Sequence, residues 1–404
     1  MSIEIRPLVA EEMLQIGALG AYVFGGAHGD DADNDMARLH RPEWTLCAVD
    51  DGKLVSSFID LPFTMRANGR AMPMCGVTVV GTLPEYRRQG LVRRIHTQAL
   101  ENLREAERPV AGLWASQAAI YQRYGYAPTT ALRRYAVDSV DIAFHDDDFG
   151  SQRVARVDAE TGAAAARALY IEFVKDRSLY LHRSKALWLQ NVLNEKQAGK
   201  PLHIALSYDA AGEASGYIVY SLHDEQRDHP TRNQELRVRD FVWLDPDAYR
   251  SLWRFIASHD LVGRVLWERA PLDDPAPMLF REPRLLQAQD REGEWLRLVD
   301  ARRALAGRGY DAEGRISIEL ASDAMTPWND GAFELSAAPD GASTRDQSSG
   351  DLRTTARALA LLFAGRESAT RLRASGLLEA DDATVAKADR LFATRHAPHC
   401  PDHY

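Results

Sequence analysis

The sequence predicts two successive α/β domains followed by an α+β domain. At 404 residues the chain is longer than a usual domain of about 100 to 200 residues, so it should form more than one hydrophobic core. The order of strand, proline and helix occurs twice, in GVTVVGTLPEYRRQGLVRRI (residues 76–95) and in VRDFVWLDPDAYRSLWRFI (residues 238–256). Beyond about residue 286 the pattern changes to two strands followed by helices rich in Ala and Leu, which is typical of an α+β unit.

The composition is that of a folded globular protein and excludes several kinds of partner. Hydrophobic residues make up 45% of the chain and charged residues 26%. Asp and Glu outnumber Lys and Arg by 58 to 49, and the net charge of −9 disfavours nucleic acid or an anionic membrane surface as a partner. Three cysteines are too few for a disulfide framework, and no run is apolar enough for a signal peptide or a membrane span. We therefore expect a cytoplasmic protein.

The first domain is expected over residues 1–134. Alternation of apolar and polar residues predicts its strands, spacing of three to four residues predicts its helices, and Asp50-Asp51-Gly52 predicts a tight hairpin turn. Leu83-Pro84 ends the strand that is richest in valine. The expected elements are a strand over 3–8, a helix over 11–19, a loop over 29–35, strands over 45–49 and 54–61, a buried strand over 74–82, a helix over 90–107, a strand over 110–115 and a short helix around Tyr121.

The second domain is expected over residues 135–285 and the third over residues 286–404. The second repeats the order of the first but lacks its arginine-glycine turn, so one copy can be active and the other structural. Its expected strands are 204–208, 216–222 and 235–243, with a turn at Gly212. The third domain is expected to contain a helix, strands over 315–320 and 332–337 around the turn Asn329-Asp330-Gly331, a solvated loop over 340–351, and then further helices.

The most specific local signal is the turn Arg87-Arg88-Gln89-Gly90-Leu91-Val92, which lies between a buried strand and a helix. Such a turn directs several backbone N–H groups and the positive end of the helix dipole into one concavity, which suits a pyrophosphate. Gly90 allows close approach of the backbone, and Arg93 and Arg94 add positive charge to that of the turn. An exposed basic first turn is the alternative, and the preceding strand favours phosphate binding.

This region resembles the acetyl-coenzyme A motif of the GNAT N-acetyltransferases, which has Arg or Gln, two residues, Gly, one residue, and then Gly or Ala. Val92 replaces that last small residue, which leaves the backbone donors in place but narrows the turn. The segments ASQAAIYQRYGY (residues 115–126) and APHCPDHY (residues 397–404) extend the resemblance to the whole chain and to the Eis (enhanced intracellular survival) type of GNAT protein. Proteins of this type look like two GNAT domains followed by a sterol-carrier-protein-like domain.

The resemblance implies a role for each matched residue. Tyr121 would be the general acid that protonates the departing thiolate, and the terminal carboxylate of Tyr404 would receive the amine proton, through water. The backbone of the strand would pair with the pantetheine like an added strand, the turn would hold the phosphates, and two further residues would border the cofactor. These cofactor-binding residues are Val80, Gly81 and Thr82 for the pantetheine, Arg87, Arg88, Gln89, Gly90, Leu91, Val92 and Arg93 for the phosphates, and Ser116 and Gln117 at the border.

The acidities of these two groups suit their roles to different degrees. Protonation of a thiolate needs a donor with a pKa of roughly 8 to 10, which a phenol provides. An α-carboxylate has a reference pKa of about 3.5 and is therefore a weak base. We expect the carboxylate of Tyr404 to hold the amine in place and relay its proton, with loss of that proton favoured by a desolvated site. The alternatives are that Tyr121 only packs with Tyr124 and Tyr126, and that the terminus is frayed.

Metal sites are not expected. Asp31 to Asp35 begins like a calcium loop, but Met36 stands where glycine is needed, so residues 30–35 are expected to be a solvated loop or an acidic rim that attracts a polycationic amine. Four residues of the tail are metal-ligand types, but Pro398 and Pro401 break any helix that would align them. These four residues are His396, His399, Cys400 and His403.

We therefore expect an N-acetyltransferase in which an amine attacks the thioester of acetyl-CoA directly, with no acyl-enzyme and no metal, since Cys47 and Cys75 lie within strands as core thiols. The resemblance implies aminoglycosides, other polyamines or lysine side chains as acceptors, and a homohexamer. Two alternatives stay open. The chain can be a non-catalytic protein that senses acetyl-CoA or binds an apolar ligand, or it can transfer a longer acyl chain if the pocket near Val79 and Ser116 is deep enough.

Overall fold

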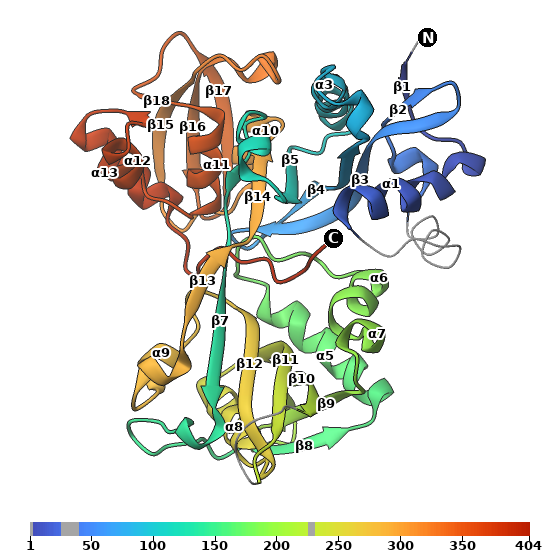
Figure 1. The fold of residues 1–404 in the computed structure, drawn as a ribbon. Helices are drawn as coiled ribbons and strands as arrows, with labels where there is room; N and C mark the ends of the chain where they lie inside the picture. Colours follow the sequence, from blue (N-terminus) through green and yellow to red (C-terminus); the bar gives the residue numbers. More distant parts are fainter. Residues whose placement is uncertain (1–2, 26–39, 225–230) are drawn as a thin grey trace.

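The computed structural model describes residues 3–25, 40–224 and 231–404 as two sheets of seven strands and one of five, with helices packed against them (Figure 1). The predicted loop over residues 29–35 lies outside the described residues. In Figure 1 the first and third sheets form the upper part of the molecule, the second sheet forms the lower part, and the C-terminus lies between them. Within the described residues, no helix is both long enough and apolar enough to cross a bilayer.

The first sheet has the order β1-β2-β3-β4-β5-β14-β6, and β4 with β5 is its one parallel pair. This parallel pairing covers only residues 74–76 against 110–112, so the two strands separate beyond Gly76 and Gly112. The strands are β1 (Glu4–Arg6), β2 (Cys47–Asp50), β3 (Lys53–Ala67), β4 (Arg70–Thr82), β5 (Val110–Trp114), β6 (Ala127–Pro128) and β14 (Glu294–Leu298).

Helices cover both faces of the first sheet. Side chains alternate along β2, so that Ala48 packs in the cluster beneath α3 while Cys47 and Val49 pack in the cluster beneath α1. The β3–β4 hairpin is longer than predicted because pairing continues to a two-residue turn at Asn68-Gly69, where both residues have the positive φ that such a turn requires. The helices are α1 (Leu14–Phe24), α3 (Leu91–Glu105) and α4 (Ala118–Gln122).

The second sheet has the order β13-β7-β12-β11-β10-β9-β8, which repeats the order of the first from the opposite end, and β11 with β12 is its parallel pair. Helix α5 packs in one hydrophobic cluster of this sheet and α8 in another. The strands are β7 (Ala131–Asp138), β8 (Arg153–Val157), β9 (Leu202–Tyr208), β10 (Ala214–Asp224), β11 (Gln234–Trp243), β12 (Val262–Ala270) and β13 (Gln289–Glu292). The helices are α5 (Ala159–Phe173), α6 (Lys185–Leu187), α7 (Glu195–Ala198), α8 (Pro246–Ala257) and α9 (Ala276–Leu279).

The first two sheets exchange strands. β14 follows the second unit in sequence but pairs with β5 and β6 of the first sheet, whereas β7 follows the first unit and pairs with β12 of the second. The chain therefore crosses between the two sheets at β6–β7 and again at β13–β14. The boundaries 1–134, 135–285 and 286–404 remain a proposal for the domains, and the segment from 289 to 298 supplies strands to both preceding sheets.

The third sheet has the order β17-β16-β15-β18-β19. The solvated loop predicted over residues 340–351 is wrong for its first half, because residues 341–347 form an edge strand whose polar side chains face solvent. The strands are β15 (Gly314–Leu320), β16 (Gly331–Ala338), β17 (Gly341–Gln347), β18 (Leu352–Thr354) and β19 (Leu378–Glu379). The helices are α10 (Ala301–Gly307), α11 (Ala356–Ala364), α12 (Ala369–Ala374) and α13 (Asp382–Phe392).

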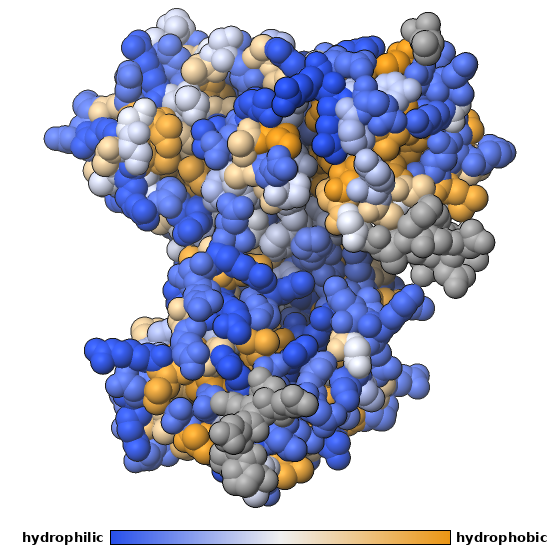
Figure 2. Space-filling model, viewed as in Figure 1, coloured by the Kyte–Doolittle hydropathy of each residue, from blue (hydrophilic) through white to orange (hydrophobic). Residues whose placement is uncertain are grey.

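The segment that follows α13, residues 393–404, runs from the third sheet into the space between the first two (Figure 1). The surface narrows at this level, and the recess seen there is mostly hydrophilic (Figure 2). The last residues are held by both sheets, since Trp114 of β5 donates a hydrogen bond to the Asp402 carbonyl at 3.1 Å and Arg269 of β12 donates to the Pro401 carbonyl at 2.7 Å. The tail is therefore part of the fold.

Candidate active site

A cavity of about 460 Å³ opens where β4 and β5 separate. Residues 77–80 of β4 form one wall, and residues 114–116 at the end of β5 form the opposite wall. Tyr121 from α4 and the tail residues His403 and Tyr404 also line this cavity, which we call the acyl cavity. The structure thus brings together the strand, the tyrosine and the tail that the sequence analysis had selected from three separate segments.

The β4 edge that faces the acyl cavity is open. Among the described residues, no backbone hydrogen bond joins residues 77–82 to a strand on this side, while the other side pairs with β3. Val79 has φ +47°, which is strained for a β-branched residue, and the Ser57 hydroxyl donates a hydrogen bond to its carbonyl at 2.6 Å. A strand edge with unpaired amide groups can bind an extended amide chain as an added strand.

The three β4 residues predicted to contact pantetheine differ in position. Val80 lines the acyl cavity. Gly81 faces α1, where an added Cβ would lie 3.0 Å from Leu19. The absence of a side chain at Gly81 therefore lets α1 pack closely against β4. The Thr82 hydroxyl lies 2.8 Å from that of Ser56, so this side chain faces β3 and only the Thr82 backbone is near the open edge.

The predicted phosphate turn forms a cradle of backbone donors. Arg88 and Gly90 both have positive φ, 62° and 76°, which curls the backbone ahead of α3. No side chain caps α3, and its first intrahelical bond is from Arg94 N to the Gly90 carbonyl, so the preceding N–H groups are available to an anion. Arg87 donates through Nε to the Thr82 carbonyl at 3.0 Å and braces the turn, whereas Leu91 is buried in the core.

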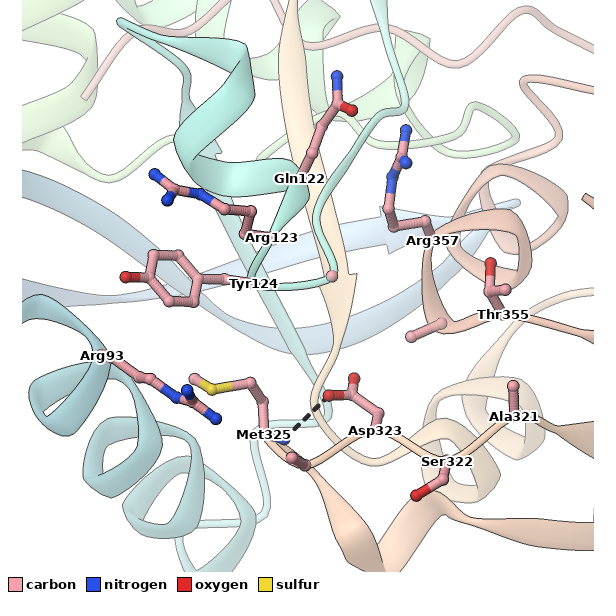
Figure 3. A pocket seen from close by; sticks show the side chains of 13 residues that line it. Arg93, Gln122, Arg123, Tyr124, Ala321, Ser322, Asp323, Met325, Thr355 and Arg357 are labelled. Carbon is pink, nitrogen blue, oxygen red and sulfur yellow. Dashed lines mark hydrogen bonds between the residues drawn. The ribbon is translucent and has the colours of Figure 1, made fainter. Parts of the chain in front are cut away.

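Arg93 opens onto a different cavity, of about 480 Å³, between the first and third sheets. Figure 3 shows Arg93 from α3 and Arg123 from the end of α4 on one side, and Arg357 from the first turn of α11 on the other. The one carboxylate in the lining, Asp323, is already paired with Arg297 at 2.7 Å. This cavity therefore carries unpaired positive charge next to the phosphate turn.

The corresponding helix of the second sheet lacks such a cradle. Asp245 caps α8, accepting a hydrogen bond from the Ala248 N–H at 2.8 Å, and Pro246 occupies the first position of the helix. The carboxylate of Asp245 would repel a phosphate at the place where the first unit offers only the backbone of Gly90. This difference supports one cofactor site per chain.

Tyr121 lies in an apolar environment. Its side chain is buried against Tyr126, with ring centroids 6.0 Å apart, and it lies at the C-terminal end of α4. Burial raises the pKa of Tyr121 to about 12, and an interaction with Ser116 partly offsets this rise. This pKa is higher than the roughly 8 to 10 expected from the sequence, because burial removes the phenol from water. Ser116 lines the acyl cavity, whereas Gln117 is exposed at the N-cap of α4.

Tyr404 is docked across the last pair of the β4–β5 ladder. An added Cβ at Gly112 would lie 2.8 Å from the Tyr404 hydroxyl, and one at Gly76 would lie 2.9 Å from its ring. The ring also packs edge-on against Phe63, with centroids 4.9 Å apart. The two glycines of one cross-strand pair thus leave the space that the tyrosine ring occupies. The alternative of a frayed terminus is not observed.

The Tyr404 hydroxyl donates a hydrogen bond to Glu294 Oε1 on β14 at 2.5 Å. Glu294 is fully buried, its other carboxylate oxygen has no partner among the described residues, and burial raises its pKa to about 8. Burial and then the neighbouring Glu294 raise the pKa of Tyr404. This pair connects the tail to the strand that the first sheet receives from beyond the second unit.

A buried ion-pair network holds the tail from the other side. Arg183 contacts Asp240 of β11 at 2.5 Å and Asp402 of the tail at 2.8 Å, and its side chain is only 1% exposed. Its guanidinium also lies 4.0 Å from the centroid of the Tyr170 ring. Removal of Arg183 would leave two buried carboxylates without their shared partner, so this network fixes the tail relative to the second sheet.

His403 lines the acyl cavity and was not predicted as a catalytic residue. Its backbone N–H donates to Asn191 Oδ1 at 2.8 Å, and its ring lies 5.0 Å from that of Trp114. Although part of the ring is exposed, desolvation, followed by the charges of Arg269 and Arg291, lowers the pKa of His403. The imidazole is therefore neutral at neutral pH and able to accept a proton.

The other tail residues with metal-ligand chemistry face different partners. His396 pairs with Asp273 at 3.2 Å, His399 lies 3.3 Å from the Ala131 carbonyl, and Cys400 is buried. No group of three or more His, Cys, Asp or Glu side chains in the described parts of the chain could hold a metal ion. Cys47 and Cys75 are buried and burial raises the pKa of both thiols, so neither resembles a nucleophile.

Three family profiles match the chain. Acetyltransferase (GNAT) domain profiles match residues 4–129 and 179–298, and a sterol carrier protein domain profile matches residues 301–401. An uncharacterized N-acetyltransferase from Streptomyces griseus is 30% identical over the full length of both chains. The N-acetyltransferase Eis of Mycobacterium tuberculosis is 28% identical over 83% of this chain and 82% of that protein.

Solved structures give the same result for the fold. Eis1 from Mycobacterium abscessus has a TM-score of 0.85 and 26% identity, over 99% of this chain and 100% of that one. A GCN5-related N-acetyltransferase from Anabaena variabilis has a TM-score of 0.87 and 24% identity over the full length of both chains, which supports the fold alone.

Proposed function

Because this chain belongs to the Eis-type GNAT N-acetyltransferases, we propose that it transfers acetyl from acetyl-CoA to amine groups of cationic acceptors by direct attack in a ternary complex. The observation that carries the proposal is the acyl cavity, which combines an open strand edge, a buried phenol and a neutral imidazole beside an uncapped helix N-terminus. The family uses acetyl-CoA, and its members are enzymes, which disfavours the non-catalytic alternative.

The cofactor would lie along β4 and end at the phosphate turn. Backbone groups of Val80 and its neighbours would pair with the pantetheine amides, while the N–H groups between Arg88 and Val92 would hold the pyrophosphate. Gly81, Thr82, Leu91 and the other predicted members of this set would contribute through the backbone. The second unit would bind no cofactor, since Asp245 already caps its helix.

Tyr121 would donate the proton that the departing thiolate takes up. With a pKa of about 12 the phenol keeps its proton throughout the neutral range. The same desolvation raises the pKa of a thiol, as for Cys47 at about 11, so the buried thiolate would be basic enough to accept the proton. The two pKa values differ by only about one unit, so the transfer would be close to balanced in free energy although the phenol is not acidic.

The amine would lose its proton to the tail. His403 is a neutral base at the cavity wall, and the terminal carboxylate of Tyr404 would orient the acceptor and relay the proton through water. Acceptors of the proposed class are aminoglycosides, polyamines and lysine side chains, which the net charge of −9 would attract. A homohexameric assembly and a cytoplasmic location are part of the same proposal.

Thiol release from acetyl-CoA tests the proposal, with a panel of aminoglycosides, polyamines and lysine peptides as acceptors. Tyr121→Phe should lower kcat about 100-fold or more while the dissociation constant for acetyl-CoA is unchanged. Tyr126→Phe is the matched control, because Tyr126 is fully buried in the same cluster and its hydroxyl has no partner among the described residues. Equal kcat in the wild type and Tyr121→Phe would refute the role of the phenol, and binding of acetyl-CoA without thiol release for any amine would refute the transferase.

His403→Gln tests the base separately. This variant should lower kcat and remove the rise of kcat with pH that deprotonation of His403 causes in the wild type below about pH 6.5. An extension beyond Tyr404 should also lower kcat, because it neutralises the α-carboxylate. If kcat of His403→Gln depends on pH as in the wild type, a group other than His403 accepts the proton of the amine.

A further inference from the structure

The second sheet contains its own cavity at the place that corresponds to the acyl cavity. The parallel pairing of β11 and β12 ends at Val238 and Trp267, as that of β4 and β5 ends at Gly76 and Gly112. A cavity of about 310 Å³ lies beyond this point, with residues of both separated strands in its wall, and we call it the arginine cavity. The tail occupies part of the opening, since Arg269 holds the Pro401 carbonyl.

Positive charge dominates the arginine cavity. Arg237, Arg239, Arg269 and Arg291 all line it, and Glu268 is the only carboxylate that the described part of the chain contributes to its lining. Glu268 is paired with Arg134 at 2.9 Å, and Arg237 is paired with Glu235 at 2.5 Å. The nearby carboxylates of Asp240 and Asp402 share the single guanidinium of Arg183.

Six guanidinium groups therefore face four carboxylates around this cavity, an excess of two positive charges. Arg239 and Arg269 have no ion pair to a carboxylate among the described residues; Arg239 instead donates to the Asn191 carbonyl and to Gln197 Oε1, both at 2.7 Å. Burial lowers the pKa of both arginines, and their mutual repulsion lowers that of Arg239 further. An excess of positive charge around one cavity favours an anionic ligand.

Two buried donors at this cavity also lack partners. Asn191 is 6% exposed and lines the cavity, and its Nδ2 has no acceptor among the described residues. Nε of Arg239 is likewise buried and unpartnered. A buried polar group without a hydrogen bond costs about 1 to 3 kcal/mol, so a ligand that accepts from both would recover this energy.

We propose that the arginine cavity binds a small phosphate-bearing anion, inorganic phosphate or diphosphate, and that the bound anion stabilises the docked tail. Phosphate oxygens suit guanidinium forks, and the volume holds one or two phosphate groups. Asn191 links the site to the tail, because its Oδ1 accepts from the His403 N–H at 2.8 Å while its Nδ2 is available to the anion. The cavity is not a second site for acetyl-CoA, because α8 is capped by Asp245 and the tail occupies part of the opening.

Titration calorimetry of the full chain with inorganic phosphate, and separately with diphosphate, tests the site. Saturating coenzyme A fills the phosphate turn at α3, and constant ionic strength removes non-specific binding. We expect one anion per chain, and binding at least tenfold weaker in the double variant Arg239→Gln/Arg291→Gln. The control is Arg390→Gln, which removes the positive charge of one exposed arginine on α13.

Release of Tyr404 by a carboxypeptidase tests the link to the tail without any measurement of acetyl transfer. Phosphate should slow this release several-fold in the wild type and in Arg390→Gln, and should have no effect in the double variant. Equal phosphate affinity in the double variant and the control would overturn the site. Phosphate binding that leaves the release of Tyr404 unchanged would overturn the coupling. Because neither readout needs an acceptor amine, failure here is distinguishable from failure of the proposed transferase.

Discussion

Replacement of Glu294 by Gln should remove a pH-dependent loss of stability. Glu294 is fully buried, and burial raises its pKa to about 8, whereas a glutamate in the unfolded chain titrates near about 4.3. Since the folded state has the higher pKa, it binds the proton more tightly than the unfolded state. The stability contributed by the protonated carboxyl is therefore complete below about pH 4, decreases as the pH rises, and is lost once the pH passes about 8.

The magnitude follows from the difference between the two pKa values. Each pH unit between them removes about 1.4 kcal/mol, so wild-type protein should lose about 3 kcal/mol between about pH 5 and pH 7 through this residue. The side-chain amide of the Glu294→Gln variant cannot ionise, but its oxygen can still accept the hydrogen bond from the Tyr404 hydroxyl that Glu294 accepts at 2.5 Å. Glu294→Gln should therefore keep its stability over the range in which the wild type loses it.

Thermal unfolding across this pH range measures the effect. For 404 residues, with an unfolding entropy of about 2.1 cal/mol/K per residue, 1 kcal/mol corresponds to about 1.2 °C, so Tm of the wild type should fall by roughly 4 °C relative to Glu294→Gln. Glu101→Gln is the control, because Glu101 is exposed on α3 and its variant should follow the wild type. Parallel curves of Tm against pH for the wild type and Glu294→Gln would refute the assignment of a raised pKa to this carboxyl.

Three further substitutions test the site and its supports. Gly112→Ala places a Cβ 2.8 Å from the Tyr404 hydroxyl, so it should destabilise the docked tail by about 1 to 3 kcal/mol and lower kcat, and a kcat equal to that of the wild type would contradict the docking. Arg93→Gln should raise KM for acetyl-CoA but not for its 3′-dephospho form, if the cavity in Figure 3 receives the 3′-phosphate; an equal rise for both would assign Arg93 to the pyrophosphate. Arg183→Met should lower the free energy of unfolding by about 3 to 5 kcal/mol, because Asp240 and Asp402 lose their shared partner. Unfolding in urea measures this change, and an effect below about 1 kcal/mol would show that the ion pairs of Arg183 do not stabilise the fold.

Much of the first sheet was predictable because its signals are local. The alternation along residues 3–8 and the spacing along α3 are properties of adjacent residues, and the strands and helices found there differ from prediction by only a few residues at most ends. The Asn68-Gly69 turn also has a local signal, because Asn-Gly is the dipeptide that two-residue hairpin turns favour. Residues 341–347 were predicted as loop because Gly, Ser and Asp are poor strand formers, and pairing with β16 overrode that preference.

The residues of the tail were selected by resemblance, but their environment was not predictable. Gly76 and Gly112 each gave the signal of an isolated glycine within a strand, which indicates close approach of another group, yet nothing local identifies Tyr404 as that group. The sequence around His403 indicates only a possible metal ligand. Its lowered pKa arises from burial and from Arg269 and Arg291, which are far from it in the chain.

The sequence by itself determined the family, the order of its units and the position of the turn at residues 87–92, because a turn is formed by the backbone of consecutive residues. Only the tertiary structure decided that β7 and β14 are exchanged between sheets and that the tail closes the acyl cavity. These features depend on contacts such as that of Trp114 with Asp402, which are 288 residues apart. Such contacts form only because the packing of two whole sheets brings their edges together. Local sequence patterns do not predict which distant segment fills the space between the sheets.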